Sequence, residues 1–367
     1  MSRRVLIACF ETPGHGGAGT AAYDLFEQAQ RDGAAVSFVN LVDRHTVPFL
    51  ERTFGPAWGN PAGLRDAHTC VLRGPFSRAQ SALAELISSI GPAVILAVGY
   101  IAALAIKRTS PASAVILLTA GCDQIDRYLP LKGDALGVLD WLRSGNRPVL
   151  FNRHERHCVE SVDLVIAHST LVHELLLLFY PTHSGKIYPE VIWMAEWIHG
   201  AARRHGAASR AFDERDMDVL FVASHWSRPE KNLGLVRGIV EACRGLAMHI
   251  VGASDVHLPG CTHHGFMASR GELFSLMGRS RTVVSPSSWD AAPGILFEAS
   301  ALDCNIVASR NCGNWRICNP DLLVDEMSPA AFATKLRLAT ESRHADNASL
   351  FLETGSYATL LDVLAVF

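Results

Sequence analysis

The sequence lacks the features that mark membrane-spanning, nucleic-acid-binding and disulfide-stabilised proteins. Its longest apolar segment, residues 93–106, stops at Lys107 and is too short to cross a bilayer. The net charge is −3, so a basic surface for nucleic acid is not expected. The nine cysteines are scattered without C-x-x-C spacing, which predicts reduced thiols and a cytoplasmic protein. A peripheral membrane contact stays open, because it needs no spanning segment.

The sequence also has no internal repeat of solenoid period, and it is not short of core-forming residues. Its 367 residues suffice for two α/β domains with sizeable cores. Hydrophobic residues make up 49% of the chain and charged residues 19%, which is typical of a globular enzyme.

Short apolar runs alternate with helical stretches along most of the chain. Val5–Phe10 and Ala114–Thr119 have the pattern of buried strands, and Ala18–Arg31 has that of a helix. Such β-α-β alternation predicts a parallel sheet covered by helices on both faces. The pattern is lost between residues 195 and 215, which we interpret as an interdomain connection, and it resumes at Asp218. The sequence thus predicts an N-terminal Rossmann-like domain at 1–195, a second at 196–345 and a terminal segment at 346–367.

The stretch from Asp290 to Ala299 is the most informative motif. It places Asp290 and Glu298 eight positions apart around a Pro-Gly turn. A strand-like run precedes the turn and a helix-like run, Ile295–Leu302, follows it. The turn therefore lies at the carboxyl end of a strand, where open α/β sheets bind phosphorylated ligands on helix N–H groups. Both carboxylates can face one cleft.

This stretch resembles the E-x7-E signature of retaining GT-B glycosyltransferases, family 4 in particular. Asp290 replaces the first Glu of the signature, and Asn305 replaces the Gly that usually follows the helix. The resemblance implies an α/β protein with two Rossmann-like domains facing each other across a cleft. It implies transfer of a sugar, with retention, from a nucleotide-sugar donor to a hydroxyl acceptor on a glycan, lipid or small molecule. The acceptor then belongs to the N-terminal domain and the donor to the C-terminal domain, and the terminal segment at 346–367 is expected to pack back on the N-terminal domain. No cofactor besides the donor substrate, and no metal, is implied.

The resemblance assigns roles to the residues of the motif. Glu298 would accept hydrogen bonds from the ribose hydroxyls of the nucleotide, since a carboxylate suits a vicinal diol. Asp290 would lie nearer the transferred sugar. Gly294 and Ile295 would donate backbone N–H groups to the donor, because Pro293 has none.

Two cations follow the first strand of the second domain. Family members carry an Arg and then a Lys at this loop, and the pair grips the diphosphate, so we expect Arg228 and Lys231 to stabilise the leaving group. The usual Gly-Arg of the loop is absent, and Ala223-Ser224 stands in its place.

Other candidate residues rest on weaker patterns. Gly16 and Gly17 lie in a glycine-rich loop after the first strand, which resembles the family's diphosphate-binding loop. Asp123 keeps the place of the Asp in the family's His-Asp pair, whose His is missing; His154 either replaces that His or lies on a helix surface. Phe266 is a candidate apolar wall for the nucleotide base.

The substitutions keep rival functions open. The same fold serves nucleotide-sugar epimerases and pseudo-glycosyltransferases, and a catalytically idle protein that binds sugar nucleotides or glycans is the alternative of another class. Asp216-Met217-Asp218 resembles a D-x-D metal motif, but it precedes a strand, so we interpret it as a solvated linker. The sequence does not predict the donor base, the sugar, the acceptor or the oligomeric state.

Overall fold

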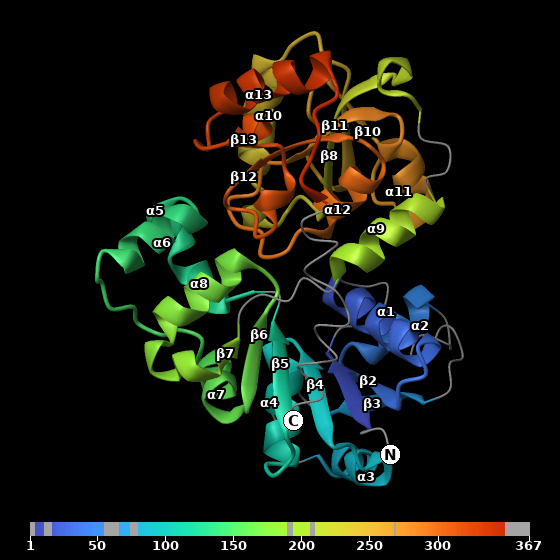
Figure 1. Ribbon diagram of the computed structural model, residues 1–367, viewed down its shortest axis with the longest axis vertical. Helices are drawn as coiled ribbons and strands as arrows, with labels where there is room; N and C mark the ends of the chain where they lie inside the picture. The colour runs from blue at the N-terminus through green and yellow to red at the C-terminus, as the bar shows by residue number, and fades with distance from the viewer. Residues whose placement is uncertain are drawn as a thin grey trace. The chain divides into compact units, whose positions relative to one another are not determined.

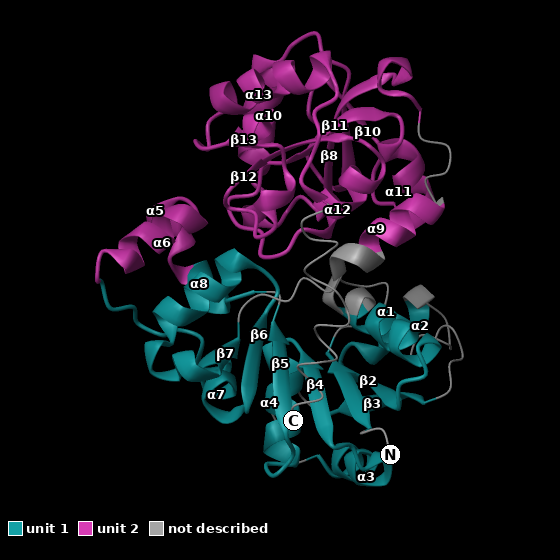
Figure 2. Cartoon of the chain, viewed as in Figure 1, with its two compact units in different colours: residues 1–126, 146–191, 358–367 teal, residues 127–145, 192–357 magenta. Residues whose placement is uncertain are grey.

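The computed structural model of the chain describes residues 4–10, 17–54, 66–73, 80–119, 121–188, 194–205, 210–267 and 269–348. The described residues within 1–126 and 146–191 form one compact unit, and those within 127–145 and 192–357 form a second (Figure 2). Each unit is built around its own sheet (Figure 1).

Unit 1 has a seven-stranded sheet in the order β3-β2-β1-β4-β5-β6-β7, with every pairing parallel. Its central strands β4 and β5 are buried along their whole length, as their unbroken apolar sequences predict for a sheet covered on both faces. The strands are β1 (Val5–Cys9), β2 (Val36–Asp43), β3 (Ala67–Leu72), β4 (Val94–Val98), β5 (Val115–Thr119), β6 (Leu164–Ala167) and β7 (Ile187–Tyr188).

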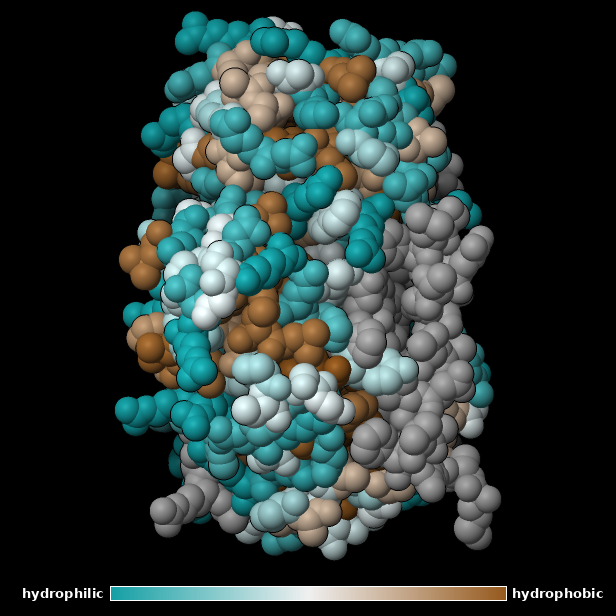
Figure 3. Space-filling view, turned by 60° about the vertical axis from the view of Figure 1, so that its left-hand side comes forward, coloured by the Kyte–Doolittle hydropathy of each residue, from teal (hydrophilic) through white to brown (hydrophobic). Residues whose placement is uncertain are grey.

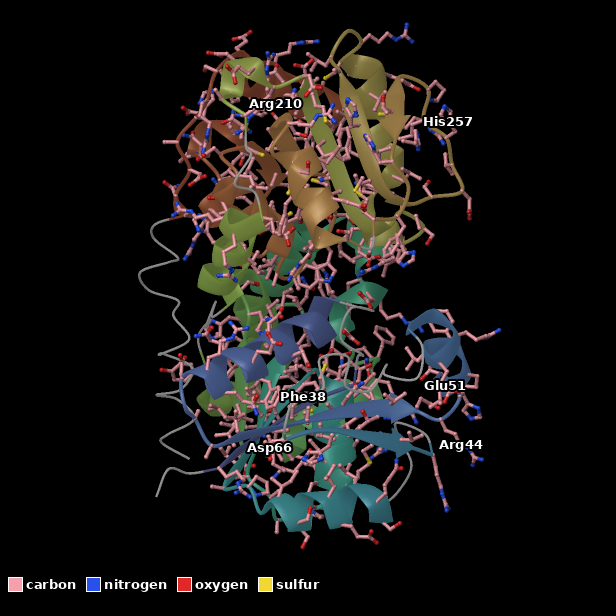
Figure 4. The ribbon with its side chains drawn as sticks, turned by 90° about the vertical axis from the view of Figure 1, so that its right-hand side faces the viewer. Phe38, Arg44, Glu51, Asp66, Arg210 and His257 are labelled. Carbon is pink, nitrogen blue, oxygen red and sulfur yellow. The ribbon has the colours of Figure 1, made fainter. Side chains whose placement is uncertain are left out.

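The helices of unit 1 pack on this sheet through apolar faces. Phe38 of β2, labelled in Figure 4, is fully buried and meets the ring of Tyr23 edge-on at 5.5 Å between centroids. The helices are α1 (Gly17–Arg31), α2 (Val47–Phe54), α3 (Ser81–Ile90), α4 (Tyr100–Thr109), α7 (Arg153–Ser161) and α8 (Thr170–Phe179).

Unit 2 has a six-stranded sheet in the order β10-β9-β8-β11-β12-β13, again parallel throughout. The strands are β8 (Met217–His225), β9 (Met248–Ala253), β10 (Cys261–His263), β11 (Ser280–Ser285), β12 (Asn305–Ser309) and β13 (Leu323–Val324).

Helices cover both faces of the second sheet (Figure 1). Val219 and Phe221 of β8 pack with α10 and α13, whereas the intervening Leu220 packs with α9, α11 and α12, because successive side chains of a strand point to opposite faces. The helices of unit 2 are α5 (Leu129–Lys132), α6 (Ala135–Arg143), α9 (Met194–His205), α10 (Leu233–Ala242), α11 (Arg270–Met277), α12 (Gly294–Ala301) and α13 (Pro329–Glu341).

Each sheet has a point where the strand order reverses. In unit 1 the reversal lies between β1 and β4, and in unit 2 it lies between β8 and β11. Loops leaving such a pair of strands diverge to opposite sides of the sheet, which leaves a crevice at the carboxyl ends where ligands of open α/β sheets bind. The fold therefore marks the loops after β8 and β11 as a site.

Two segments expected to be linkers are ordered elements. Most of the predicted connection at 195–215 is helix α9, whose Ile198 and Ala202 lie in the core of unit 2. The D-x-D residues flank the start of β8 and are ion-paired. Asp216 accepts from Arg279 and from Arg210, which is labelled in Figure 4, and Asp218 accepts from Arg281 at 3.1 Å.

The largest difference between the predicted domains and the observed units lies at residues 127–145. Residues 127–145, predicted within the N-terminal domain, cluster with unit 2, because the start of α6 is hydrogen-bonded to Ser288 and Asn311. Ala348 lies in the core of unit 2. Residues 349–367 of the predicted terminal segment lie outside the described residues, so their packing on the first domain stays a prediction.

Exposed apolar side chains are scattered over the described surface. On the face shown in Figure 3, hydrophobic residues form separate patches among hydrophilic ones. None of the described helices combines the length and the apolar character that crossing a membrane requires. The large apolar residues with the most exposed side chains are Phe49, Val71, Leu131, Val149, Phe151, Tyr188, Phe266 and Leu338.

Candidate active site

Lys231 and Asp290 meet at the point where the strand order of unit 2 reverses. Lys231 ends a short 3-10 helix that follows β8, and Asp290 follows β11. Because β8 and β11 are neighbours in the sheet, their following loops lie together, and Lys231 Nζ donates to Asp290 Oδ2 at 2.5 Å. The two side chains are 16% and 17% exposed, so the pair borders solvent without lying free in it.

The backbone of Asp290 is held by the loop that follows β12. Its N–H donates to the carbonyl oxygen of Asn311 at 3.0 Å, and its own carbonyl oxygen accepts from the N–H of Gly313 at 2.7 Å. The Asp290 carboxylate is thus fixed at both the side chain and the backbone, and it is a preorganised acceptor at the carboxyl end of the sheet.

Helix α12 begins beside this loop with Gly294 and Ile295. A Cβ on Gly294 would lie 3.1 Å from Ile198 Cδ1, so glycine lets the start of α12 lie close against α9. The first N–H groups of a helix have no acceptor within it and carry the positive end of its dipole. The start of α12 therefore suits an anionic group, as predicted for a phosphate-binding turn.

Glu298 lies one turn further along α12, and its side chain is buried. Burial raises the pKa of its carboxyl above the usual value, and the guanidinium of Arg270 opposes this rise. Arg270 is the first residue of α11, and its Nη2 lies 3.6 Å from Glu298 Oε1. Arg270 could not be predicted from the sequence, because no spacing along the chain relates the start of α11 to α12.

Arg228 lies at the same end of the sheet but makes a different contact. Its guanidinium pairs with Glu230, two residues along, and its side chain is 54% exposed. The carbonyl oxygen of Glu230 accepts from the N–H of Ser288 at 2.9 Å, which ties this loop to the one that carries Asp290. Arg228 therefore lies near the Lys231–Asp290 pair, but its positive charge is already paired with the carboxylate of Glu230.

Phe266 is exposed at the carboxyl end of β10. Its ring stacks on His225, the last residue of β8, with 6.1 Å between centroids and 20° between planes. The pair offers a flat aromatic surface of the kind that a nucleotide base can stack on. His257, labelled in Figure 4, lies in the loop between β9 and β10. Its ring stacks on that of His263, the last residue of β10.

The remaining predicted residues belong to unit 1. Gly16 lies outside the described residues, and Gly17 is the first residue of α1. Asp123 begins a 3-10 helix directly after β5, and burial raises the pKa of its carboxyl, against a hydrogen bond from Tyr100 that lowers it. Asn152 Nδ2 lies 3.4 Å from both Asp123 Oδ2 and the hydroxyl of Tyr100.

A second carboxylate, that of Glu155 on α7, contacts the backbone of Asp123. It accepts hydrogen bonds from the N–H of Asp123, from the hydroxyl of Tyr180 at 2.6 Å and from Cys122 Sγ at 3.6 Å. Burial raises the pKa of Glu155 to about 7. Glu155 could not be predicted from the sequence, because an acid between two basic residues on a helix gives no signal of burial. Its neighbour His154 was the candidate instead.

The structure thus joins some predicted residues and separates others. Lys231 contacts Asp290, and Gly294, Ile295 and Glu298 share one helix in unit 2, whereas Asp123 belongs to unit 1. Among the described residues, no three His, Cys, Asp or Glu side chains are grouped to hold a metal ion. A metal-free site remains a prediction.

Comparison with known proteins identifies the fold of the chain. No protein-family model matches the chain, and no curated protein matches it. Three of the solved structures that it resembles are HepE of Anabaena in complex with UDP, sucrose-phosphate synthase of Thermosynechococcus elongatus and UDP-GlcNAc 2-epimerase of Methanocaldococcus jannaschii.

HepE is 13% identical, with 99% of this chain and 100% of that one covered and a TM-score of 0.64. The synthase is 14% identical, with both chains covered in full and a TM-score of 0.63. The epimerase is 10% identical, with 99% of each chain covered and a TM-score of 0.54. At such identities the likeness shows the fold, so the predicted fold class is confirmed: the chain has the GT-B fold, with two Rossmann-like α/β domains.

Proposed function

We propose that the protein transfers a sugar from a nucleotide-sugar donor to a hydroxyl acceptor, with retention at the anomeric carbon. The observation that carries this proposal is the Lys231–Asp290 pair at the reversal point between β8 and β11, beside the first turn of α12. A cation, a carboxylate and a helix N-terminus at one sheet edge suit the two charged parts of the transition state. Lys231 and the helix N-terminus match the negative leaving diphosphate, and Asp290 matches the positive oxocarbenium-like sugar.

Lys231 and the start of α12 stabilise the diphosphate as it leaves. A lysine ammonium has three N–H donors, and one of them goes to Asp290, so the same group can also donate to phosphate oxygens. The N–H groups of Gly294 and Ile295 add the positive end of the helix dipole. Charge that grows on the leaving group is then met by donors that need no rearrangement.

Glu298 and Arg270 hold the nucleoside part of the donor. Glu298 accepts from the ribose hydroxyls, and Arg270 favours the ionised form that can accept from both. Phe266 and His225 supply a surface for the base.

The transfer step follows from these assignments. The bond between the anomeric carbon and the phosphate oxygen breaks first, and both electrons leave with the diphosphate. The acceptor oxygen attacks the resulting oxocarbenium-like carbon from the same face, and its proton passes to the departing phosphate oxygen. Asp290 lies beside the sugar, and a catalytic role for Asp123 of unit 1 stays a prediction.

A nucleotide-sugar epimerase is the second candidate, because one structural neighbour is a UDP-GlcNAc 2-epimerase. The two reactions differ in their products. A transferase releases the nucleoside diphosphate together with a glycosylated acceptor. An epimerase returns an isomeric sugar without any acceptor.

The test begins with a thermal-shift panel of UDP, GDP, ADP, TDP and their sugars, in which a bound nucleotide raises the unfolding temperature. UDP and UDP-glucose come first, because HepE was solved with both. Release of nucleoside diphosphate is then followed with and without candidate acceptors. Acceptor-dependent release supports the proposal, sugar isomerisation without acceptor supports the epimerase, and binding without any turnover supports an idle binder.

A further inference from the structure

We propose that residues 127–145, here called the excursion, position Asp290 through the side chain of Asn311. This inference rests on the proposed function only in giving Asp290 a role beside the sugar. The excursion comprises α5 and α6 and leaves unit 1 to pack as part of unit 2 (Figure 2).

The start of α6 is joined to the loops around Asp290 by three hydrogen bonds. The N–H of Leu136 donates to Asn311 Oδ1 at 2.8 Å, and Asn311 Nδ2 donates to Asp134 Oδ2 at 3.2 Å. The N–H of Ala135 donates to the carbonyl oxygen of Ser288 at 3.0 Å. The start of α6 therefore contacts both loops that meet at Asp290: the loop after β11 through Ser288, and the loop after β12 through Asn311.

Asn311 links the excursion to Asp290. Its side chain is buried and bonded at both its oxygen and its nitrogen to α6, while its backbone carbonyl accepts from the N–H of Asp290 at 3.0 Å. Movement of the Asn311 side chain would shift this carbonyl and with it the Asp290 backbone. A reacting group needs its position set to a fraction of an ångström by such supporting contacts.

Aromatic, cation and backbone contacts hold the excursion together. The rings of Tyr128 and Trp141 lie 5.2 Å apart, and Lys132 Nζ lies 5.2 Å from the centre of the Trp141 ring. A Cβ on Gly137 would lie 2.5 Å from the carbonyl oxygen of Lys132, so only glycine fits the close turn between α5 and α6. Asp134 caps α6 by accepting from the N–H of Gly137 at 2.8 Å.

Asp134 thus has two functions that can be separated. Its Oδ1 caps α6, and its Oδ2 holds Asn311. Asp134→Ser keeps a good cap but has one oxygen, which cannot serve both partners. Asp134→Ala removes both contacts. Asp140→Ala is the matched control, because Asp140 is an exposed acid of the same helix that pairs only with Arg143 among the described residues.

Amide hydrogen exchange tests the positioning directly, without any nucleotide. In Asp134→Ser we expect peptides spanning residues 286–314 to exchange about tenfold faster, as for loss of one charge-assisted hydrogen bond, with α6 unchanged. In Asp134→Ala both regions should exchange faster, and in Asp140→Ala neither should. Unchanged exchange of 286–314 in Asp134→Ser, or equal acceleration in the control, would overturn the inference.

Turnover of UDP-glucose gives a second, independent readout. In Asp134→Ser we expect kcat to fall about tenfold with the Kd for UDP unchanged, and no further fall in an Asp290→Asn background, since both changes act on one group. Equal losses in both backgrounds would contradict the inference. If the wild-type protein bound no nucleotide, the proposed function would fail, while the exchange experiment would still decide the role of the excursion.

Discussion

At the scale of single residues, the two predicted phosphate-binding cations differ in surroundings. Lys231 is mostly buried against Asp290, whereas Arg228 is exposed and matched by Glu230. The sequence could place both on one loop but could not rank them, because the ranking depends on which acids lie nearby. Under the proposed function, we therefore expect Lys231 to be the main contact to the diphosphate.

Lys231→Ala should therefore lower kcat/KM by about 100-fold or more, as for loss of one preorganised charge donor. Arg228→Ala should cost clearly less, since exposed pairs with neighbours contribute little. Lys335→Ala, which removes a half-buried lysine of α13 that donates to the carbonyl oxygen of Asp321, is the control and should leave turnover unchanged. Steady-state kinetics beside a melting curve for each variant measures this, and a larger loss in Arg228→Ala than in Lys231→Ala would reverse the assignment.

Glu155 gives a prediction about stability and pH. Burial raises the pKa of its carboxyl from 4.5 to about 7 in the folded protein, so between these pH values the folded state binds more protons than the unfolded state. The contribution of Glu155 to the free energy of unfolding should therefore fall as pH rises from 4.5 to 7, by about 3 kcal/mol at most. Buried His168, whose pKa is lowered to about 4, contributes in the opposite direction, so only the difference between variants isolates Glu155.

Denaturant unfolding at a series of pH values checks this expectation. Glu155→Gln, which cannot ionise, should lack this contribution, so its free energy of unfolding should rise relative to that of wild type as pH increases from 4.5 to 7. Glu160→Gln is the control on the same helix and should keep the contribution, because Glu160 is exposed and paired with Arg156. The same pH slope in Glu155→Gln and wild type would show that other groups cause it.

At the scale of elements, local pattern was sufficient for much of the fold. The apolar run of β5 and the Pro-Gly turn at the start of α12 predicted the bounds of both elements to within one or two residues. A strand buried on both faces and a helix start can each be recognised from neighbouring residues in the sequence. Helix α9 was mistaken for a linker, since its charged residues hide the apolar face that α12 and α11 cover. The Lys231–Asp290 contact could not be predicted from spacing, because it depends on β8 and β11 being neighbours.

The packing of α12 against α9 can be tested at Gly294. In Gly294→Ala the new Cβ would lie 3.1 Å from Ile198 Cδ1, so we expect a loss of about 1 kcal/mol in the free energy of unfolding. Adding Ile198→Val, which removes that Cδ1 atom, should restore most of the loss. Gly234→Ala on α10 meets no atom within 4 Å and should not destabilise. Additive losses in the double variant would mean that the two residues do not compete for space.

At the scale of the whole molecule, alternating strands and helices predicted two Rossmann-like domains, and the resemblance of residues 290–299 to a glycosyltransferase signature implied the GT-B fold; both are confirmed. The passage of residues 127–145 into unit 2 was not predictable, because it depends on buried hydrogen bonds between residues far apart in the sequence. The partnership of Glu298 with Arg270 was hidden for the same reason.

Turnover should not need a divalent metal. Asp216 and Asp218 are paired with arginines at the amino end of β8, the end opposite Lys231. Lys231 and the first turn of α12 already supply positive charge for the diphosphate. EDTA should leave the rate unchanged, and loss of turnover that Mn²⁺ or Mg²⁺ restores would contradict the prediction.

The central claim is that the carboxyl edge of the second sheet binds the nucleotide of a sugar donor. Calorimetric titration of the nucleoside diphosphate selected by the panel into wild type and Glu298→Gln tests it most directly. Loss of a charged acceptor for the ribose hydroxyls should weaken binding by roughly 1.5–3 kcal/mol, or about 10- to 100-fold, with the unfolding temperature little changed. Glu272→Gln, at an exposed position of α11, should bind like wild type. Equal affinity in Glu298→Gln and wild type would contradict the account.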